Sequence, residues 1–246
     1  MSVPVFLAAT EALADDEILL DGPEGRHAAT VRRLRPGERV DLTDGAGSVA
    51  ECVVREARRD ALLLTVHARY GVPAPRPRVI VAQGLPKGDR GELAVEMMTE
   101  VGVDVIIPWT AARSVVQWKG DRAAKALARW RTTAREAGKQ SRRFHLPEVT
   151  EPVGTAALAE RLRAVAGNGL AVVLHEEAER PLSGLTPPPG GDIMLVVGPE
   201  GGVSEEELDR FRAAGAVPAV LGPTILRTST AGVAAAAVLL ARCGRW

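Results

Sequence analysis

From residue 79 onward, apolar runs typical of buried strands alternate with segments typical of amphipathic helices. The apolar runs are "VIVAQGL", "DVIIPW", "LAVVLHEE", "DIMLVVG" and "AVPAVLG". Strands that alternate with helices form parallel sheets, because each helix returns the chain to the edge at which the next strand begins. Helices then cover both faces of the sheet, so its strands are apolar throughout. We therefore predict an α/β domain with a mostly parallel sheet.

Capping signals mark several helices of this domain. Asp89 and Glu92 have the spacing of an N-cap residue and the third helical residue, and Ser204 and Glu207 repeat it as a predicted capping box. Thr230 precedes a small-residue helix near the end of the chain. It is an N-cap candidate, because a threonine hydroxyl can accept a hydrogen bond from the first turn.

The part before residue 73 has a different pattern. "ERVDLTDG", "SVAECVVREA" and "ALLLTVHARY" are rich in β-forming residues, and one short helix is expected over residues 24–34. The segment "YGVPAPRPRV" at 70–79 contains three prolines, which favours an extended connector. We predict two domains: residues 1–72 form a small, mostly β module, and residues 73–246 form the α/β domain.

The composition is that of an ordinary globular protein, with 46% hydrophobic residues, 25% charged residues and a formal net charge of +0. The net charge does not point to a nucleic-acid partner, although local basic patches remain open. Cys52 and Cys243 are distant in sequence and provide neither a disulfide framework nor a zinc site, so we expect no metal. The N-terminus lacks a basic segment, and no apolar run reaches about 18 residues. We expect a cytoplasmic protein without a membrane span.

Three strands of the α/β domain end in unusual loops. "LHEEAERP", "GPEGG" and "LGPTILRTSTAG" each follow an apolar run. In open parallel sheets, ligands bind outside the carboxyl ends of the strands. The three loops therefore predict a pocket at that edge.

The loop "GPEGG" has two open interpretations. Its proline and glycines allow a ligand to approach the backbone closely. It has neither a lysine nor GxGxxG spacing, which disfavours a triphosphate and favours a nucleoside-like ligand without phosphate. Alternatively, the loop is only a tight turn that leads into a capped helix.

The sequence contains no GxSxG, HExxH or Cys/His motif, so hydrolase and metalloenzyme functions have little support. Two basic clusters stand out. Each cluster alone could be a solvated face, but two clusters in different modules suggest a bipartite surface for a polyanion. His27 and His145 lie within them, so phosphate or base contact is favoured over metal binding. The clusters contain Arg26, His27, Arg32, Arg33 and Arg35 in the first module, and Arg135, Lys139, Arg142, Arg143 and His145 in the second.

Six segments together resemble one known family. They are "HAATVRRLRPGE", "LPKGDRGELAVEMMTEVGV", "KQSRRFHLPEV", "LHEE", "LVVGPEGGVSEEE" and "LGPTILRTSTA", in this order along almost the whole chain. With them the sequence resembles the RsmE-type ribosomal RNA methyltransferases of the SPOUT superfamily. Each segment alone is weakly diagnostic, whereas the last two in tandem at this spacing are highly specific.

The resemblance implies a fold and a cofactor. Residues 1–72 would form a PUA-like β-barrel that binds RNA, and the α/β domain would end in a trefoil knot. S-adenosyl-L-methionine would bind in the knot, held mainly by backbone atoms of three loops. The residues implied for this cofactor are Leu174, His175, Glu176, Gly198, Pro199, Glu200, Gly201, Gly202, Leu221, Gly222, Ile225, Leu226 and Arg227.

The resemblance also implies partners. Members of the family are homodimers that methylate N3 of a specific uridine in 16S ribosomal RNA, so we expect this RNA, within the small ribosomal subunit, as the partner. Arg33 and Arg143 match positions at which the family usually has arginine. The implied RNA-binding residues are Arg26, His27, Arg32, Arg33, Arg35, Lys87, Lys139, Gln140, Arg142 and Arg143.

Two arginines are the catalytic candidates. Uracil N3 must lose its proton before it attacks a sulfonium methyl group, so a cation near O2 or O4 would stabilise the developing anion. Arg227 is the first candidate, and Arg143 of the partner subunit is the second. The chain has Ser229 where the family commonly has glutamate, and Met97 where it often has lysine. We infer that position 229 is structural or faces the substrate.

Other functions remain open. A non-catalytic RNA-binding protein of the same fold would explain Ser229 as a trace of lost activity. A related knotted methyltransferase could act on tRNA or 23S rRNA instead. A nucleotide-binding dehydrogenase or kinase is disfavoured, because the phosphate-binding motifs of those enzymes are missing.

Overall fold

The computed structural model of the protein describes residues 3–246, and its backbone separates into two compact units. The first unit contains the chain up to Ala74 together with Gly138–Leu146, and the second contains Pro75–Ala137 and Pro147–Trp246. Residues 138–146 thus belong to the first unit, although the sequence-based boundary at 72/73 assigns them to the second. Backbone and side-chain contacts explain this, since Gly47 N donates to Phe144 O and Lys139 pairs with Glu24.

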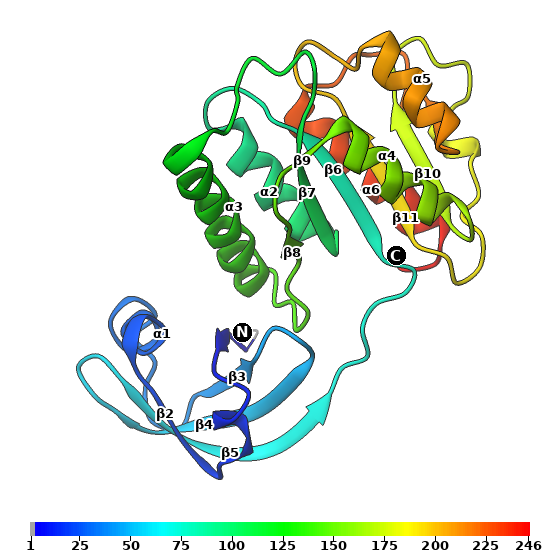
Figure 1. Ribbon diagram of the computed structural model, residues 1–246. Coiled ribbons are helices and arrows are strands. Elements are labelled where there is room, and N and C mark those ends of the chain that lie inside the picture. Colours follow the sequence, from blue (N-terminus) through cyan, green and yellow to red (C-terminus); the bar gives the residue numbers. More distant parts are fainter. Residues whose placement is uncertain (1–2) are drawn as a thin grey trace. The chain divides into compact units, whose positions relative to one another are not determined.

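The first unit is a curled five-stranded sheet (Figure 1) in the order β1-β3-β4-β5-β2. Its strands are β1 (Val5–Leu7), β2 (Glu17–Leu20), β3 (Arg39–Thr43), β4 (Ser48–Ala57) and β5 (Leu62–Gly71). β1 pairs with β3 in parallel, and the other pairs are antiparallel. The long β4–β5 pair has irregular register at Glu51/Cys52 and Val54/Glu56, and such bulges increase the bend of a strand.

Helical turns close one part of this sheet. The helix expected over residues 24–34 is present as α1 (Gly22–Arg26) and a π-helical turn, η2 (His27–Val31), while η1 (Ala12–Ala14) is a short 3₁₀ helix. Cys52 is buried in the core beside Phe6 and Leu42. Burial raises the pKa of the Cys52 thiol to about 11, so the thiol stays neutral and packs as a small apolar group.

The second unit is a seven-stranded parallel sheet, as predicted. The strand order is β12-β10-β11-β6-β7-β8, and β9 also pairs with β7. The central strand β6 therefore lies between β11 and β7. The strands are β6 (Val79–Gly84), β7 (Val105–Thr110), β8 (Glu148–Val149), β9 (Val153–Gly154), β10 (Leu170–Leu174), β11 (Ile193–Val197) and the edge strand β12 (Val217–Ala219).

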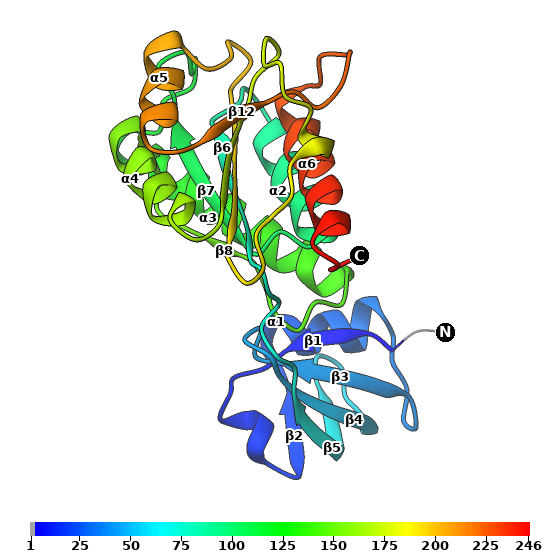
Figure 2. The same cartoon turned by 90° about the vertical axis from the view of Figure 1, so that its right-hand side faces the viewer.

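Helices cover both faces of this sheet, which Figure 2 shows edge-on. On one face, α2 (Arg90–Val101), α3 (Gly120–Gln140) and α6 (Thr228–Arg242) pack against Val79, Val81, Leu195 and Val197, among others. On the other face, α4 (Thr155–Ala166) and α5 (Glu205–Ala213) pack against Ile80, Ala82, Met194 and Val196. Successive strand residues thus point to opposite helical layers, which is why the strand sequences are apolar without interruption.

The helix starts differ in part from the sequence-based expectation. The capping box of Ser204 and Glu207 at the start of α5 is confirmed. Asp89 occupies the N-cap position of α2, as predicted, but its side chain makes no capping hydrogen bond. The position was therefore predicted correctly and the hydrogen bond was not. Glu92 instead accepts a hydrogen bond from Arg129 Nε at 2.8 Å. The expected N-cap Thr230 is also wrong, because α6 begins at Thr228 and its N-cap residue is Arg227.

Candidate functional site

The loops after β10, β11 and β12 enclose a pocket of about 510 Å³ at the carboxyl edge of the parallel sheet. The structure therefore brings together the three loops that the sequence singled out. Every residue implied for the cofactor lines this pocket: Leu174, His175, Glu176, Gly198, Pro199, Glu200, Gly201, Gly202, Leu221, Gly222, Ile225, Leu226 and Arg227.

The loop after β11 is fixed against the end of β6. A Cβ atom on Gly84 would lie 2.6 Å from the backbone nitrogen of Pro199, so only glycine permits this approach. Glu200 Oε1 accepts a hydrogen bond from Lys87 N at 3.0 Å, which ties the loop to the β6–α2 connection. Gly202 closes the turn, with φ +72° and a 2.9 Å bond from its N–H to Pro199 O. The backbone of this pocket wall is thus held in one conformation.

Arg113, which the sequence analysis missed, supports the same loop from the far side. Its Nη1 donates to Gly201 O at 3.2 Å, and a Cβ atom on Gly201 would lie 2.9 Å from Arg113 Cβ. An exposed arginine after β7 carries no sequence signal of such a contact. The contact depends on the fold, which places the loop after β7 beside the loop after β11.

Glu207 connects the start of α5 to two other elements. Besides its capping bonds with Ser204, Glu207 Oε1 accepts hydrogen bonds from Ala112 N and from Thr155 Oγ1, each at 2.8 Å. The carboxylate is buried and satisfied on both oxygens. It therefore fixes the helix that follows the pocket loop to the β7 loop and to α4.

The loop after β10 is joined to the edge strand. His175 N donates to Ala219 O at 3.0 Å, and its ring Nδ1 faces Glu177 N at 3.3 Å. These bonds orient the half-buried His175 ring at the pocket wall.

The loop after β12 leads directly into α6. Arg227 is the N-cap residue of α6, makes no side-chain capping bond and is exposed on the pocket wall. Ile225 and Leu226 beside it are also exposed, Ile225 by 83%. The next two residues turn inward, and both Thr228 and Ser229 are buried. The family-atypical Ser229 thus faces the interior of the unit.

A buried hydrogen-bond chain lies beneath the pocket. Gln83, the penultimate residue of β6, donates from Nε2 to Thr228 Oγ1 at 2.9 Å and to Gly84 O at 3.1 Å. Thr228 Oγ1 in turn donates to Gly198 O at 2.7 Å. The sequence analysis did not identify Gln83, although an amide within the apolar run "VIVAQGL" was the available signal.

The pocket also includes residues that the sequence analysis did not assign. Arg90 is the first residue of α2 and adds a guanidinium to the wall. Arg90 lies in the segment "LPKGDRGELAVEMMTEVGV", which contributes to the family resemblance, but the resemblance assigned no function to Arg90 itself. The other unassigned lining residues include Val197, Val203, Pro223, Thr224, Thr228 and Ala231.

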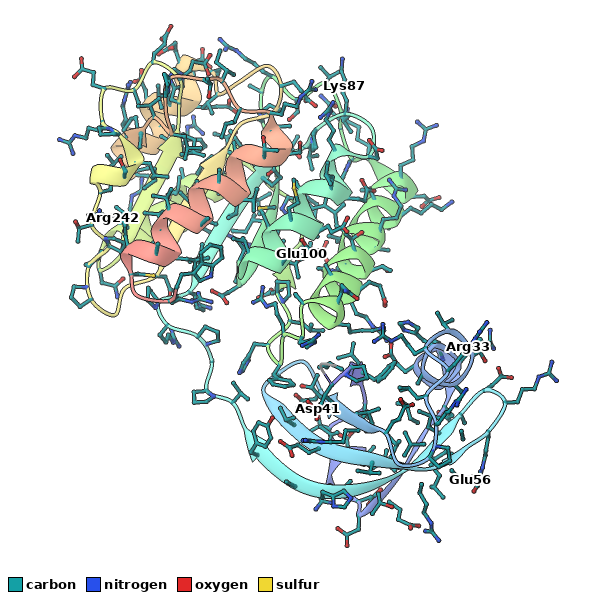
Figure 3. The ribbon with its side chains drawn as sticks, turned by 180° about the vertical axis from the view of Figure 1, so that it is seen from behind. Arg33, Asp41, Glu56, Lys87, Glu100 and Arg242 are labelled. Carbon is teal, nitrogen blue, oxygen red and sulfur yellow. The ribbon has the colours of Figure 1, made fainter. Side chains whose placement is uncertain are left out.

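The first basic cluster lies around α1 and η2. Arg26, Arg32, Arg33 and Arg35 are exposed, whereas His27 is half-buried with its ring edge-on to Phe6. Arg33 has a left-handed backbone (φ +56°), and Figure 3 shows its side chain beside the helical coil.

Four residues of the second basic cluster belong to the same unit as the first cluster, whereas Arg135, which is exposed on α3, belongs to the second unit. Arg142 is exposed and also left-handed (φ +56°), and Gln140 is exposed at the end of α3. Arg143 is half-buried, and its Nε donates to His145 O at 3.0 Å. Lys139 is buried against Glu24, so the structure gives it a partner within the unit where the sequence suggested a phosphate contact.

The two remaining predicted residues, Lys87 and His145, lie in different units. Lys87 is exposed between β6 and α2 in the second unit, as Figure 3 shows. His145 faces Val72 O through Nε2 at 2.7 Å and lies against Gly47, so its ring has a structural contact. The predicted basic residues are thus divided: most lie in the first unit, and Lys87, Arg135 and Arg227 lie in the second.

Among residues 3–246, no helix has the length and hydropathy needed to cross a bilayer. Within the same range, His, Cys, Asp and Glu side chains form no group of three or more that could hold a metal ion.

Comparison with known proteins adds a second line of observation. Residues 73–240 match the RNA methyltransferase domain family, and residues 20–66 match the RNA methyltransferase PUA domain family. Ribosomal RNA small subunit methyltransferase E of Mycobacterium bovis is 48% identical over 229 residues, which are 93% of this chain and 87% of that protein. The Bacillus subtilis protein of the same name is 33% identical over 86% of this chain and 85% of its own length.

A solved structure is similar over nearly the whole length of both chains. It is ribosomal RNA small subunit methyltransferase E from Neisseria gonorrhoeae, bound to S-adenosyl methionine. Its TM-score with this chain is 0.83 at 28% sequence identity, and the match covers 98% of each chain.

Proposed function

This chain belongs to the RNA methyltransferase family that includes the ribosomal RNA small subunit methyltransferase E proteins, and from this membership we propose that it methylates N3 of a specific uridine. Its activity as an S-adenosylmethionine-dependent methyltransferase of 16S rRNA follows from the family. The choice of uridine N3 as the methyl acceptor is the step that we add.

The pocket supports the cofactor part of this proposal, because it fits S-adenosylmethionine in size and chemistry. Its volume of about 510 Å³ lies within the range of about 300–1,000 Å³ that is usual for small-molecule sites. Glycine-rich turns expose backbone N–H and C=O groups that can recognise an adenine ring. The carboxylates of Glu176 and Glu200 provide acceptors for hydroxyl or ammonium groups.

The residues that would hold the cofactor are those of the three loops, from Leu174 to Glu176, Gly198 to Gly202 and Leu221 to Arg227. We also propose that the C-terminal part of the α/β domain (73–246) is knotted. Two observations support this: α6 follows the edge strand β12 yet packs on α2, and Thr228 lies against Gly198 of an earlier loop.

The reaction needs a nucleophile and charge stabilisation. S-adenosylmethionine, when bound, supplies an electrophilic methyl group attached to a positively charged sulfur. Uridine N3 becomes a nucleophile once its proton passes to solvent, and the uracil ring then carries negative charge. The exposed Arg227 guanidinium at the pocket can stabilise that charge at O2 or O4. Arg143 of the partner subunit is the second candidate for this role.

RNA binding falls to the first unit in this proposal. A uridine in a folded RNA must leave its stack to reach a pocket, and phosphate contacts by arginines fix the RNA while it does so. Arg33 and the exposed arginines around it supply these contacts, within the PUA-like module of residues 1–72. We further propose a homodimer that acts in the cytoplasm, where its ribosomal substrate lies.

Mass spectrometry of 16S rRNA nucleosides tests the function. Cells that lack the gene are expected to lose one 3-methyluridine, and the wild-type gene should restore it. Restoration by a gene for the Arg227→Ala variant serves as the control and should fail. If 3-methyluridine is unchanged in the deletion strain, the assignment to uridine N3 is wrong. Calorimetry with S-adenosylmethionine then distinguishes two explanations. A methyltransferase with another target would still bind the cofactor, whereas a non-catalytic RNA-binding protein would not.

A further inference from the structure

Gln83 lies beneath the proposed cofactor pocket without lining it. It is fully buried near the end of β6, where it pairs in register with Val197, the last residue of β11. Gly198 follows Val197 directly and begins the pocket loop. An amide in the core of a parallel sheet is costly unless its polar atoms are used, so its hydrogen bonds define what it does.

The hydrogen bonds fix the orientation of the Gln83 amide. Gly84 O can only accept, so the amide atom 3.1 Å from it is the nitrogen. The same nitrogen donates its second hydrogen to Thr228 Oγ1 at 2.9 Å. The amide oxygen accepts no hydrogen bond from residues 3–246. Gln83 thus acts through its two N–H donors.

This orientation determines the direction of the Thr228 hydroxyl. Because Thr228 Oγ1 accepts from Gln83, its own hydrogen is available for Gly198 O, which lies 2.7 Å away. The resulting chain runs from β6 through the first residue of α6 to the first residue of the loop after β11. It links two pocket loops that lie 30 positions apart in sequence.

We propose that Gln83 is a positioning residue for methyl transfer: through Thr228 it holds the loop after β11 and the start of α6 in register. Thr228 follows Arg227 directly, so the chain also fixes the backbone from which the Arg227 side chain extends. Gln83 touches neither cofactor nor RNA in this proposal, which rests on the proposed S-adenosylmethionine site. Its loss should weaken both cofactor binding and turnover.

The test compares Gln83→Met with wild type by calorimetric titration of S-adenosylmethionine and by the rate of methyl transfer to 16S rRNA. Methionine keeps the length and burial but donates no hydrogen bond. One lost hydrogen bond predicts a dissociation constant about 5- to 10-fold higher. Thr99→Val is the matched control, because Thr99 is equally buried and donates to Val95 O within α2, away from the pocket. It should bind the cofactor as wild type does.

A double-mutant cycle with Thr228 separates positioning from simple destabilisation. If Gln83 acts through the Thr228 hydroxyl, Gln83→Met should have no further effect on affinity in a Thr228→Val background. Thr228→Ser keeps the hydroxyl and should keep wild-type affinity. An equal loss from Gln83→Met in both backgrounds would overturn the proposal, as would wild-type affinity in the single variant.

Three other outcomes lead to different conclusions. If the wild-type protein does not bind S-adenosylmethionine, the proposed function fails, and the role of Gln83 fails with it. If it binds and only the Gln83 result is negative, the function stands and the positioning role is wrong. If Gln83→Met does not fold, the affinities of Thr228→Val and Thr228→Ser for S-adenosylmethionine are compared instead. Equal affinity in these two variants overturns the proposed chain of hydrogen bonds. A loss of affinity in the valine variant alone supports it.

Discussion

Lys139 Nζ lies 2.8 Å from Glu24 Oε1, although the two residues are 115 positions apart in the chain. Both side chains are nearly buried, with 6% and 10% of their surfaces exposed. Glu24 also accepts a hydrogen bond from Leu7 N at 3.1 Å. The pair therefore joins residues 138–146 to the N-terminal sheet and helps to make them one unit.

Replacing Lys139 should destabilise this unit. Lys139→Met leaves the Glu24 carboxylate buried without its ammonium partner, and we expect the free energy of unfolding to fall by about 3 kcal/mol in urea titrations followed by circular dichroism. Adding Glu24→Leu removes the buried carboxylate as well and should restore part of the loss. Arg163→Met, in the exposed pair with Glu160, is the control and should change nothing measurable. A Lys139→Met protein as stable as wild type would show that the pair contributes little.

The capping box of α5 gives a graded prediction. Ser204→Ala removes one capping acceptor and should cost about 1 kcal/mol. Glu207→Ala also removes the acceptor for Ala112 N and Thr155 Oγ1, so it should cost about 3 kcal/mol. Thermal unfolding of the two variants checks the order. Equal losses would mean that the contacts of Glu207 beyond the helix do not stabilise the protein.

Arg227→Ala should separate chemistry from binding. The side chain is exposed, so its removal should leave the fold intact. If the guanidinium stabilises charge on uracil, kcat should fall by about 100-fold or more, while calorimetric affinity for S-adenosylmethionine stays unchanged. Arg227→Lys keeps the charge without the planar fork and should recover only part of the rate. A variant with normal turnover would rule out the role.

Arg33→Glu should act on RNA alone. The charge reversal lies in the first unit, so binding of a labelled 16S rRNA fragment should weaken while affinity for S-adenosylmethionine is retained. The loss should diminish as salt rises, because phosphate contacts release counterions. Arg163→Glu makes the same charge change on α4 and is the matched control. Equal loss of RNA binding in the two variants would indicate a general charge effect, and loss of cofactor binding would indicate misfolding.

Asp192 gives a pH-dependent prediction. Burial raises the pKa of its carboxyl, but hydrogen bonds and positive charge from Arg78 outweigh burial and hold the pKa below its usual value of 3.8. The folded state thus favours the ionised carboxylate. The stabilisation is present above the unfolded-state pKa and is lost as pH falls through the lower folded-state pKa.

Urea unfolding of wild type and Asp192→Asn tests this. Arg78 Nε lies 3.1 Å from Asp192 Oδ2, but the Arg78 side chain is about half exposed, so the difference at pH 7 should stay below about 1 kcal/mol. It should shrink towards zero as the pH approaches about 2. A difference that is constant between pH 7 and pH 2 would show that ionisation of Asp192 does not contribute.

The sheet and its pocket loops could be predicted because their signals are local. Each buried strand is a continuous apolar run, and the loops after β11 and β12 carry a Gly-Pro pair close to the strand end. Parallel pairing then brings the three strand ends to one edge. The Ser204–Glu207 box spans four residues and was predictable for the same reason.

The contacts that were missed join distant segments. Gln83 and Thr228 are 145 positions apart, and Arg113 and Gly201 are 88 apart. No periodicity marks such pairs, because each depends on which loops the fold places together. Asp89 is a contact that was predicted but is not formed. Its spacing to Glu92 is that of a capping box, but Glu92 instead accepts a hydrogen bond from Arg129.

The edge strand β12 has a consequence for behaviour in a crowded solution. A sheet edge with unpaired amide groups can recruit a strand from another molecule and start aggregation. β12 is only three residues long, and its middle residue, Pro218, has no amide hydrogen to offer. The outer rim of the sheet therefore presents a poor template for intermolecular strand addition, and the protein can keep an open parallel sheet without a capping helix at that edge.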